Sequence, residues 1–254
     1  MDNVGKPVNI YAAGSLRTVL PALTSAFTTT AINVPFQVRY GPAGLLRECI
    51  EAGDRPDLFL SANLAHPSRL AESGHARPPV VFARNTLAAI VRKDAGITTK
   101  NFVDRLLSPE VAIATSTPLK DPSGDYAWDV FRRIDRIRPG AFGVLDTKAQ
   151  ILVGAAEPTQ PPGNYDAVAA ALKAGTASVF LGYRTGLSGL AANVDGTEIV
   201  TIPPEVNAEP LYGMAALSDC SPAGLAFALF VLSVPGQKLL ADSGFHSVTP
   251  LVVA

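Results

Sequence analysis

Hydrophobic residues follow two spacings along the chain, and their alternation predicts strands followed by helices. Residues 8–11 are rich in β-forming side chains, and apolar residues then recur at the three- and four-residue spacing of one helix face up to Phe27. The same succession returns at 34–52 and at 111–134. Strand runs that alternate with helix runs are typical of α/β architecture.

The remaining elements follow from the same two patterns and from their glycine and proline boundaries. Strands are expected at 8–11, 34–40, 57–61, 80–83, 87–91, 111–114, 178–182 and 211–217. Helices are expected from Ser15 to Phe27 and at 45–52, 67–73, 122–134, 165–174, 227–232 and 237–241. The stretch 157–163 is too dense in proline for a helix or a central strand, and it predicts a surface insertion.

Three of the expected helices begin at turns of small residues. The first turn ends in Ser15, the second spans 41–44, and the third spans 122–124. The first N–H groups of a helix have no acceptor within the helix, so such a start suits an anion. Ser15 and Ala43 follow consecutive strands and should lie at one edge of one sheet, where ligands of open α/β sheets bind. Alanine offers only its backbone N–H. The three turns together predict one anion surrounded by helix starts.

Composition and charge narrow the class of protein. The chain has 254 residues, of which 48% are hydrophobic and 17% are charged, enough for one large domain or two ordinary ones. A formal net charge of −1 disfavours nucleic acid and anionic membranes as partners. No run of about 18 apolar residues predicts a membrane span. Residues 1–6 lack a hydrophobic signal region, which fits a cytoplasmic protein or a mature form whose leader was removed.

The residues that an enzyme needs do not form a recognisable set. The three histidines are scattered and form no HExxH motif, and the two cysteines have no zinc spacing. The segment around Ser15 lacks the second glycine of a GxSxG nucleophile elbow. No glycine loop matches a nucleotide motif. Ser15 remains open as a ligand-binding residue, as a simple helix cap or, least favoured, as a nucleophile.

Several blocks of sequence resemble the molybdate-binding component of bacterial ABC importers. The resemblance covers nearly the whole chain and is densest in the first 65 residues. The blocks that carry it are Tyr11–Leu16, Gly44–Gly53, Pro56–Asn63, Asp121–Ala127 and Phe180–Tyr183.

The resemblance implies a type II periplasmic binding protein fold with two α/β lobes, each a mixed sheet flanked by helices, and a ligand cleft between them. The first lobe would comprise 1–84 and 201–254, and the second 85–200. The implied function is capture of a tetrahedral oxyanion, molybdate or tungstate, for an ABC importer. The expected protein is a periplasmic monomer whose leader was removed. It would deliver the anion to a membrane permease, without a cofactor and without catalysis.

The same resemblance implies five ligand-binding residues, which are also the only expected contacts of the bound metal oxyanion. Ser15 would donate through its hydroxyl and its N–H, and Ala43 falls where the family usually has a serine. Ser123 falls where a backbone N–H is used, Tyr183 matches a phenol donor, and a further backbone donor is assigned near Val153. A doubly charged oxyanion without a proton accepts hydrogen bonds only, so a site made of donors suits it.

Three departures from the family pattern keep other ligands open. Ala43 removes one hydroxyl, and a hydrogen bond to a charged group is worth roughly 1.5–3 kcal/mol. Asp125 could accept from a ligand hydroxyl, and Arg184 could favour a carboxylate or sulfonate. The alternatives are the same fold with a different anion, sulfate or a small organic acid; a serine- or carboxylate-dependent hydrolase; and a cytoplasmic oxyanion sensor.

Overall fold

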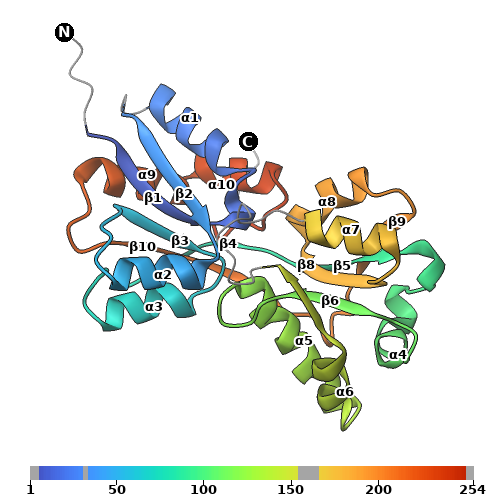
Figure 1. Cartoon of the computed structure of the whole chain (residues 1–254). Helices are drawn as coiled ribbons and strands as arrows, with labels where there is room; N and C mark the ends of the chain where they lie inside the picture. Colours follow the sequence, from blue (N-terminus) through green and yellow to red (C-terminus); the bar gives the residue numbers. More distant parts are fainter. Residues whose placement is uncertain (1–5, 31–33, 154–165, 250–254) are drawn as a thin grey trace. The chain divides into compact units, whose positions relative to one another are not determined.

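The chain folds into two compact units, which a computed structural model describes for residues 6–30, 34–153 and 166–249 (Figure 1). The first unit combines residues 1–85 with 211–254, and the second unit comprises 86–210. The boundary between 200 and 201 that the resemblance implies for the second crossing lies ten residues too early. The intervening stretch belongs to the second unit, where the Asn207 amide donates to the Leu87 carbonyl at 3.1 Å.

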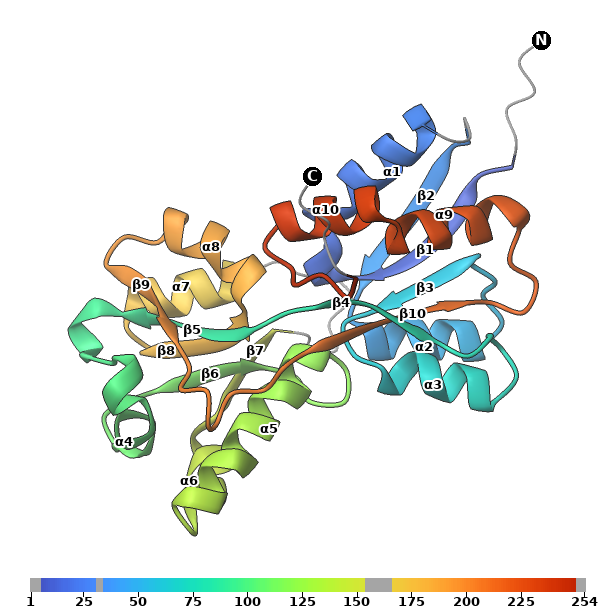
Figure 2. The same cartoon turned by 180° about the vertical axis from the view of Figure 1, so that it is seen from behind.

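A five-stranded mixed sheet forms the centre of the first unit. Its order is β2 (Phe36–Gly41), β1 (Val8–Ala13), β3 (Leu58–Ser61), β10 (Leu211–Ala216) and β4 (Val80–Arg84). The first three strands are parallel, and β10 is antiparallel to both of its neighbours. One face carries α1 (Leu20–Thr30), α9 (Pro222–Leu232) and α10 (Val234–Asp242), and the other carries α2 (Ala43–Glu51) and α3 (Ala65–Glu72) (Figures 1 and 2).

The second unit repeats this strand arrangement. Its order is β7 (Gln150–Val153), β6 (Ile113–Ser116), β8 (Val179–Tyr183), β5 (Leu87–Arg92) and β9 (Thr197–Thr201). Again three parallel strands come first, with the earliest in the chain in their middle, and the fourth strand is antiparallel. The helices are α4 (Phe102–Leu107), α5 (Pro122–Ile137), α6 (Ala141–Lys148), α7 (Asp166–Ala174) and α8 (Arg184–Asn193). Both units are therefore mixed sheets flanked by helices, as the resemblance implies.

The start of the first helix differs from the prediction. Residues Gly14–Leu16 form a short 3-10 helix, and α1 begins only at Leu20. Pro21 explains the difference, because proline has no N–H and is tolerated in the first turn of a helix but breaks its interior. A helix that ran from Ser15 would have placed this proline in its second turn.

Aromatic side chains join the helices of the first unit to its sheet. The Phe27 ring packs edge-on against Phe36, Phe227 and Phe230, with centroids 5.9, 5.4 and 5.6 Å away. Such pairs stabilise beyond their buried area. Within the described residues no single helix is long and apolar enough to span a membrane, whereas the pair α9 and α10, bent by 64°, meets that test by length and composition.

Candidate functional site

In the first unit, the strand register places Ser15 and Ala43 at the same edge of the sheet. Ala13, the last residue of β1, pairs with Gly41, the last residue of β2. Ser15 and Ala43 each follow two residues later. Ala43 is the first residue of α2, so its N–H points out of the helix start without an intrahelical acceptor. A hydroxyl and a backbone N–H thus lie beyond neighbouring strand ends.

The Ser15 hydroxyl is held from inside the unit by two buried residues. The phenol of Tyr212 donates to the Ser15 hydroxyl oxygen at 2.9 Å, and the Asn85 amide donates to the Tyr212 phenol at 3.3 Å. Tyr212 is completely buried and Asn85 is 1% exposed. Sequence reasoning missed both residues. The one local signal for Tyr212 is a polar tip at the start of an otherwise apolar strand.

In the second unit, α5 begins where the sequence predicts, and its cap engages the backbone of Ser123. A carboxylate oxygen of Asp121, the residue before the helix, accepts from the Ser123 backbone N–H at 3.0 Å. The N–H that the resemblance implied as a ligand donor therefore already has a partner. The Ser123 hydroxyl, in contrast, is buried without a hydrogen-bond partner among the described residues. The side chain, not the backbone, is the available donor at this position.

Asp121 is an unusual group for the start of a helix that is expected to bind an anion. Desolvation and, to a smaller extent, the neighbouring Asp125 raise the pKa of its carboxyl to about 6, against the hydrogen bonds from Ser123 and Ser116 that lower it. Burial also raises the pKa of Asp125. One Asp125 oxygen accepts from the Leu119 N–H at 2.7 Å, where Leu119 has a left-handed φ of 66°. That oxygen therefore holds the loop before α5. The sequence suggests Asp125 instead as an acceptor for a ligand hydroxyl.

Gly124 lets that loop cross directly over the start of α5. A Cβ at this position would lie 2.5 Å from the Ser116 carbonyl oxygen and 2.7 Å from the Pro118 nitrogen. Both are backbone atoms, which cannot move aside as a flexible side chain can. The close approach fixes the loop over Ser123 and requires glycine.

Tyr183 lies near the same helix start. It ends β8, is 2% exposed, and packs edge-on against Tyr126 with ring centroids 6.3 Å apart. Tyr126 follows Ser123 by three residues, which places both on one face of α5. The structure therefore brings Ser123 and Tyr183 to one end of the second sheet.

Two other residues considered from the sequence have different surroundings. The exposed Arg184 donates to the Thr201 hydroxyl at 3.3 Å, so its guanidinium is directed toward β9. The Val153 carbonyl accepts from the N–H and the hydroxyl of Thr117 at 2.8 and 2.9 Å. The segment that follows, 154–165, lies outside the described residues and includes the proline-rich stretch. The backbone donor near Val153 stays a prediction.

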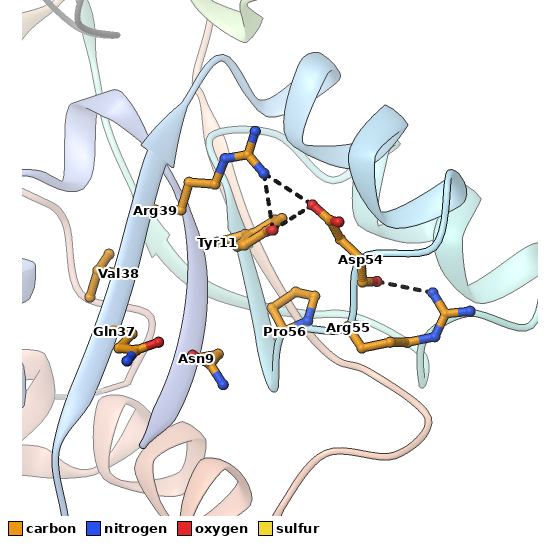
Figure 3. A pocket seen from close by; sticks show the side chains of 8 residues that line it. All are labelled: Asn9, Tyr11, Gln37, Val38, Arg39, Asp54, Arg55 and Pro56. Carbon is orange, nitrogen blue, oxygen red and sulfur yellow. Dashed lines mark hydrogen bonds and ion pairs between the residues drawn. The ribbon is translucent and has the colours of Figure 1, made fainter. Parts of the chain in front are cut away.

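A pocket of about 310 Å³ opens elsewhere on the first unit (Figure 3). It is lined by Asn9, Tyr11, Gln37, Val38, Arg39, Asp54, Arg55 and Pro56. Its central polar groups are paired with one another: the Tyr11 phenol donates to Asp54 at 2.5 Å, and Arg39 donates to both at 3.1 and 3.0 Å (Figure 3). Neither Ser15 nor Ala43 is among the residues that line it. The pocket is therefore separate from the edge that carries Ser15.

Potential metal ligands do not gather in the part of the chain that the structure describes. No group of three or more His, Cys, Asp or Glu side chains could hold an ion there. Burial and the nearby Arg47 lower the pKa of His66 to about 4, so this imidazole is neutral at pH 7. The polar chemistry of both strand edges is thus one of hydroxyls, amides and carboxyls.

Comparisons with known proteins agree with this arrangement. The family model described as "Bacterial extracellular solute-binding protein" matches residues 8–246. An uncharacterised protein of Pasteurella multocida is 34% identical over 244 residues, covering 94% of this chain and 98% of that protein. The sulfate-binding protein of Mycobacterium tuberculosis superposes with a TM-score of 0.75 at 19% identity, covering 97% of this chain and 88% of that one. The periplasmic molybdate-binding protein of Azotobacter vinelandii superposes with a TM-score of 0.72 at 15% identity, covering 96% of this chain and 99% of that one.

Proposed function

The chain belongs to the bacterial extracellular solute-binding proteins, and from this membership and its two-lobed type II periplasmic binding protein fold we propose that it captures a small oxyanion, molybdate or tungstate, for an ABC importer. One observation carries the proposal. In each unit a neutral hydroxyl follows the middle strand of the parallel trio at the edge where ligands bind: Ser15 after β1 and Ser123 after β6.

Neutral donors are the chemistry that such an anion requires. Its oxygens accept hydrogen bonds and donate none, and bonds to a charged acceptor are about twice as strong as those between neutral groups. In the proposal the anion receives the Ser15 hydroxyl and the Ala43 N–H from the first unit. From the second unit it receives the Ser123 hydroxyl and the Tyr183 phenol. The ligand is bound and released without a covalent step.

The partner in this proposal is the membrane permease of the importer, and the protein works as a monomer in the periplasm. A hydrolase is a weaker candidate for a reason that concerns Ser15. A nucleophilic serine gives its proton to an adjacent base. The side-chain partner of Ser15 is instead a phenol that donates to it. The hydrogen bond runs in the direction opposite to the one that nucleophilic attack needs.

Thermal unfolding in the presence of candidate anions tests the proposal. Molybdate, tungstate, sulfate, phosphate and small carboxylates are compared at equal concentrations. An anion present at about 1,000 times its Kd stabilises the folded protein by roughly 4 kcal/mol. We expect molybdate and tungstate to raise Tm most. A rise with sulfate or carboxylates alone would contradict the choice of ligand and favour a different anion on the same fold.

Ser15→Ala then tests the site itself. The lost hydrogen bond to a charged ligand predicts molybdate affinity roughly 10- to 100-fold weaker by titration calorimetry. Ser25→Ala, on the exposed side of α1, is the matched control and should bind as the unmodified protein does. Full molybdate affinity in Ser15→Ala would remove this residue from the site.

A further inference from the structure

We propose that Asn85 and Tyr212 are positioning residues that fix the Ser15 hydroxyl as a proton donor, so that the first unit selects oxyanions without a proton. This inference rests on the proposed function and concerns the selectivity of the same site. It assigns a role to two buried residues that contact no ligand in the proposal.

The direction of each hydrogen bond follows from the chemistry of the groups. An amide nitrogen only donates, so the Tyr212 oxygen must accept from Asn85 at 3.3 Å. The single phenolic proton is then available to Ser15, 2.9 Å away. The Ser15 oxygen accepts that proton, and its own proton must point away from Tyr212. Bonds in such a chain polarise and strengthen one another, by about 10–30% each.

Burial keeps these hydrogen bonds in this one arrangement. Tyr212 has no exposed surface and Asn85 is 1% exposed, so water cannot replace either partner. The Tyr212 ring packs edge-on between Phe82 and Phe245, with centroids 6.1 and 5.4 Å away. Rotation of the phenol away from Ser15 would require these rings to move. The serine therefore meets a ligand with a preset orientation of its hydroxyl.

A preset donor discriminates between anions that differ by one proton. Molybdate presents bare oxygens, each of which accepts the Ser15 proton. Hydrogen phosphate also carries a hydroxyl. Directed at Ser15, this group meets an oxygen that already accepts from Tyr212 and whose own proton is turned toward the ligand, so the ligand hydroxyl is poorly paired there. Without the Tyr212 phenol, the serine hydroxyl could turn and accept. Removal of the phenol should therefore weaken molybdate binding and reduce the preference for molybdate over phosphate.

A double-mutant cycle tests whether Tyr212 acts through Ser15. Molybdate and phosphate affinities are measured by calorimetry for the unmodified protein, Tyr212→Phe, Ser15→Ala and the double variant. We expect Tyr212→Phe to weaken molybdate binding about 5- to 10-fold and to leave phosphate binding equal or tighter. In the Ser15→Ala background the same change should have no effect. Equal losses in both backgrounds, or unchanged selectivity, would overturn the inference.

Two further variants control for folding. Tyr11→Phe removes another hydrogen-bonded phenol from the same sheet, in the pocket of Figure 3, and should leave both affinities unchanged. Asn85→Ala keeps the phenol and should weaken molybdate binding about 2- to 3-fold. This variant tests the hydrogen-bond chain from Asn85 to Ser15 even if Tyr212→Phe does not fold. Normal affinity in Asn85→Ala and an equal loss in Tyr11→Phe would both contradict the inference.

The unmodified protein separates the two proposals. If it binds sulfate and not molybdate, the ligand assignment fails, and the same cycle run with sulfate and phosphate still decides the role of Tyr212. If it binds none of the five anions, both proposals fail.

Discussion

The two units share one strand order but supply opposite chemistry at equivalent places. In the first unit, Ser15 follows the middle parallel strand and is backed by the neutral groups of Tyr212 and Asn85. In the second unit, Ser123 follows the middle parallel strand and is backed by the carboxylate of Asp121. Topology fixes where such a turn lies, and the residues just before and behind it decide what it offers.

The difference has an energetic meaning. The start of a helix carries a partial positive charge that attracts anions. Asp121 places a negative charge on the start of α5 and takes up one of its N–H groups. At α2 the residue before the helix is Pro42, which brings no charge and leaves the Ala43 N–H outward. In the proposed site the first unit is therefore the more favourable half for an anion, and the second unit depends more on side-chain hydroxyls.

The largest expected effect concerns the loop over α5. Gly124→Ala places a Cβ 2.5 Å from a backbone oxygen and should lower the free energy of unfolding by about 3 kcal/mol, measured by denaturant titration. Gly41→Ala, the comparable change in the first unit, meets only the side chain of Leu46, whose nearest carbon is 3.1 Å away, and should lose far less stability. Gly143→Ala, in open space within α6, should be neutral or stabilising. Equal stability of all three variants would refute the close approach.

A smaller effect is expected from the charge of Asp121. Its pKa is raised to about 6, so between about pH 4 and 6 the folded state binds more protons than the unfolded state. Stability therefore falls as pH rises through this window. Asp121→Asn keeps a capping oxygen and removes the buried charge, which should raise stability at pH 7 by about 2 kcal/mol and leave it unchanged at pH 4.

Asp135→Asn is the control for that change, because this carboxylate also accepts from two backbone N–H groups, those of Gly140 and Phe142. It should give no gain at pH 7. A gain of equal size would mean that the effect is not specific to the start of α5.

His66 should give the opposite pH dependence in the first unit. Its pKa is lowered to about 4, so the folded state binds fewer protons than the unfolded state between about pH 6.5 and 4. Stability is then lost as pH falls through this window, by about 1–2 kcal/mol between pH 7 and 5. His66→Gln should remove that part of the slope in thermal unfolding between pH 7 and 5. An unchanged slope would show that other groups carry the acid sensitivity.

The smallest effect tests whether the first unit can be improved as a donor site. Ala43→Ser adds a hydroxyl beside Ser15 at the start of α2 and should tighten molybdate binding about 5-fold, or about 1 kcal/mol. Ala71→Ser, on the half-buried side of α3, is the control and should leave the affinity unchanged. Weaker binding in Ala43→Ser would indicate that the edge has no room for another hydroxyl.

Much of the fold could be predicted from local pattern, and the exceptions have physical causes. Strands with continuous apolar runs, such as β3 and β8, are recognisable because both of their faces are buried. The short edge strands β7 and β9 escaped prediction because their exposed residues leave little hydrophobic signal. Pro21 could have corrected the start of α1, because its place in a helix is restricted.

Only those parts of the candidate site that come from segments close together in the sequence could be predicted. Ser15 and Ala43 could be placed together because their strands follow one another in the sequence. Tyr212 lies 197 residues from Ser15 and 127 from Asn85, so only the folded chain brings these three together. The cap at Asp121 was visible in the sequence, since aspartate before proline is typical of a helix start. The resemblance drew attention to Ser123 instead.

The position of β10 has a consequence for the order in which the protein is made. This strand lies between β3 and β4, although more than 120 residues of chain separate it from either of them. At roughly 5–20 residues per second, a ribosome needs several seconds to add that length. Until then the first sheet lacks an inner strand, and Ser15 lacks the tyrosine behind it. A nascent chain that carries the whole N-terminal segment thus still lacks part of the proposed anion site, which can form only after β10 has been made.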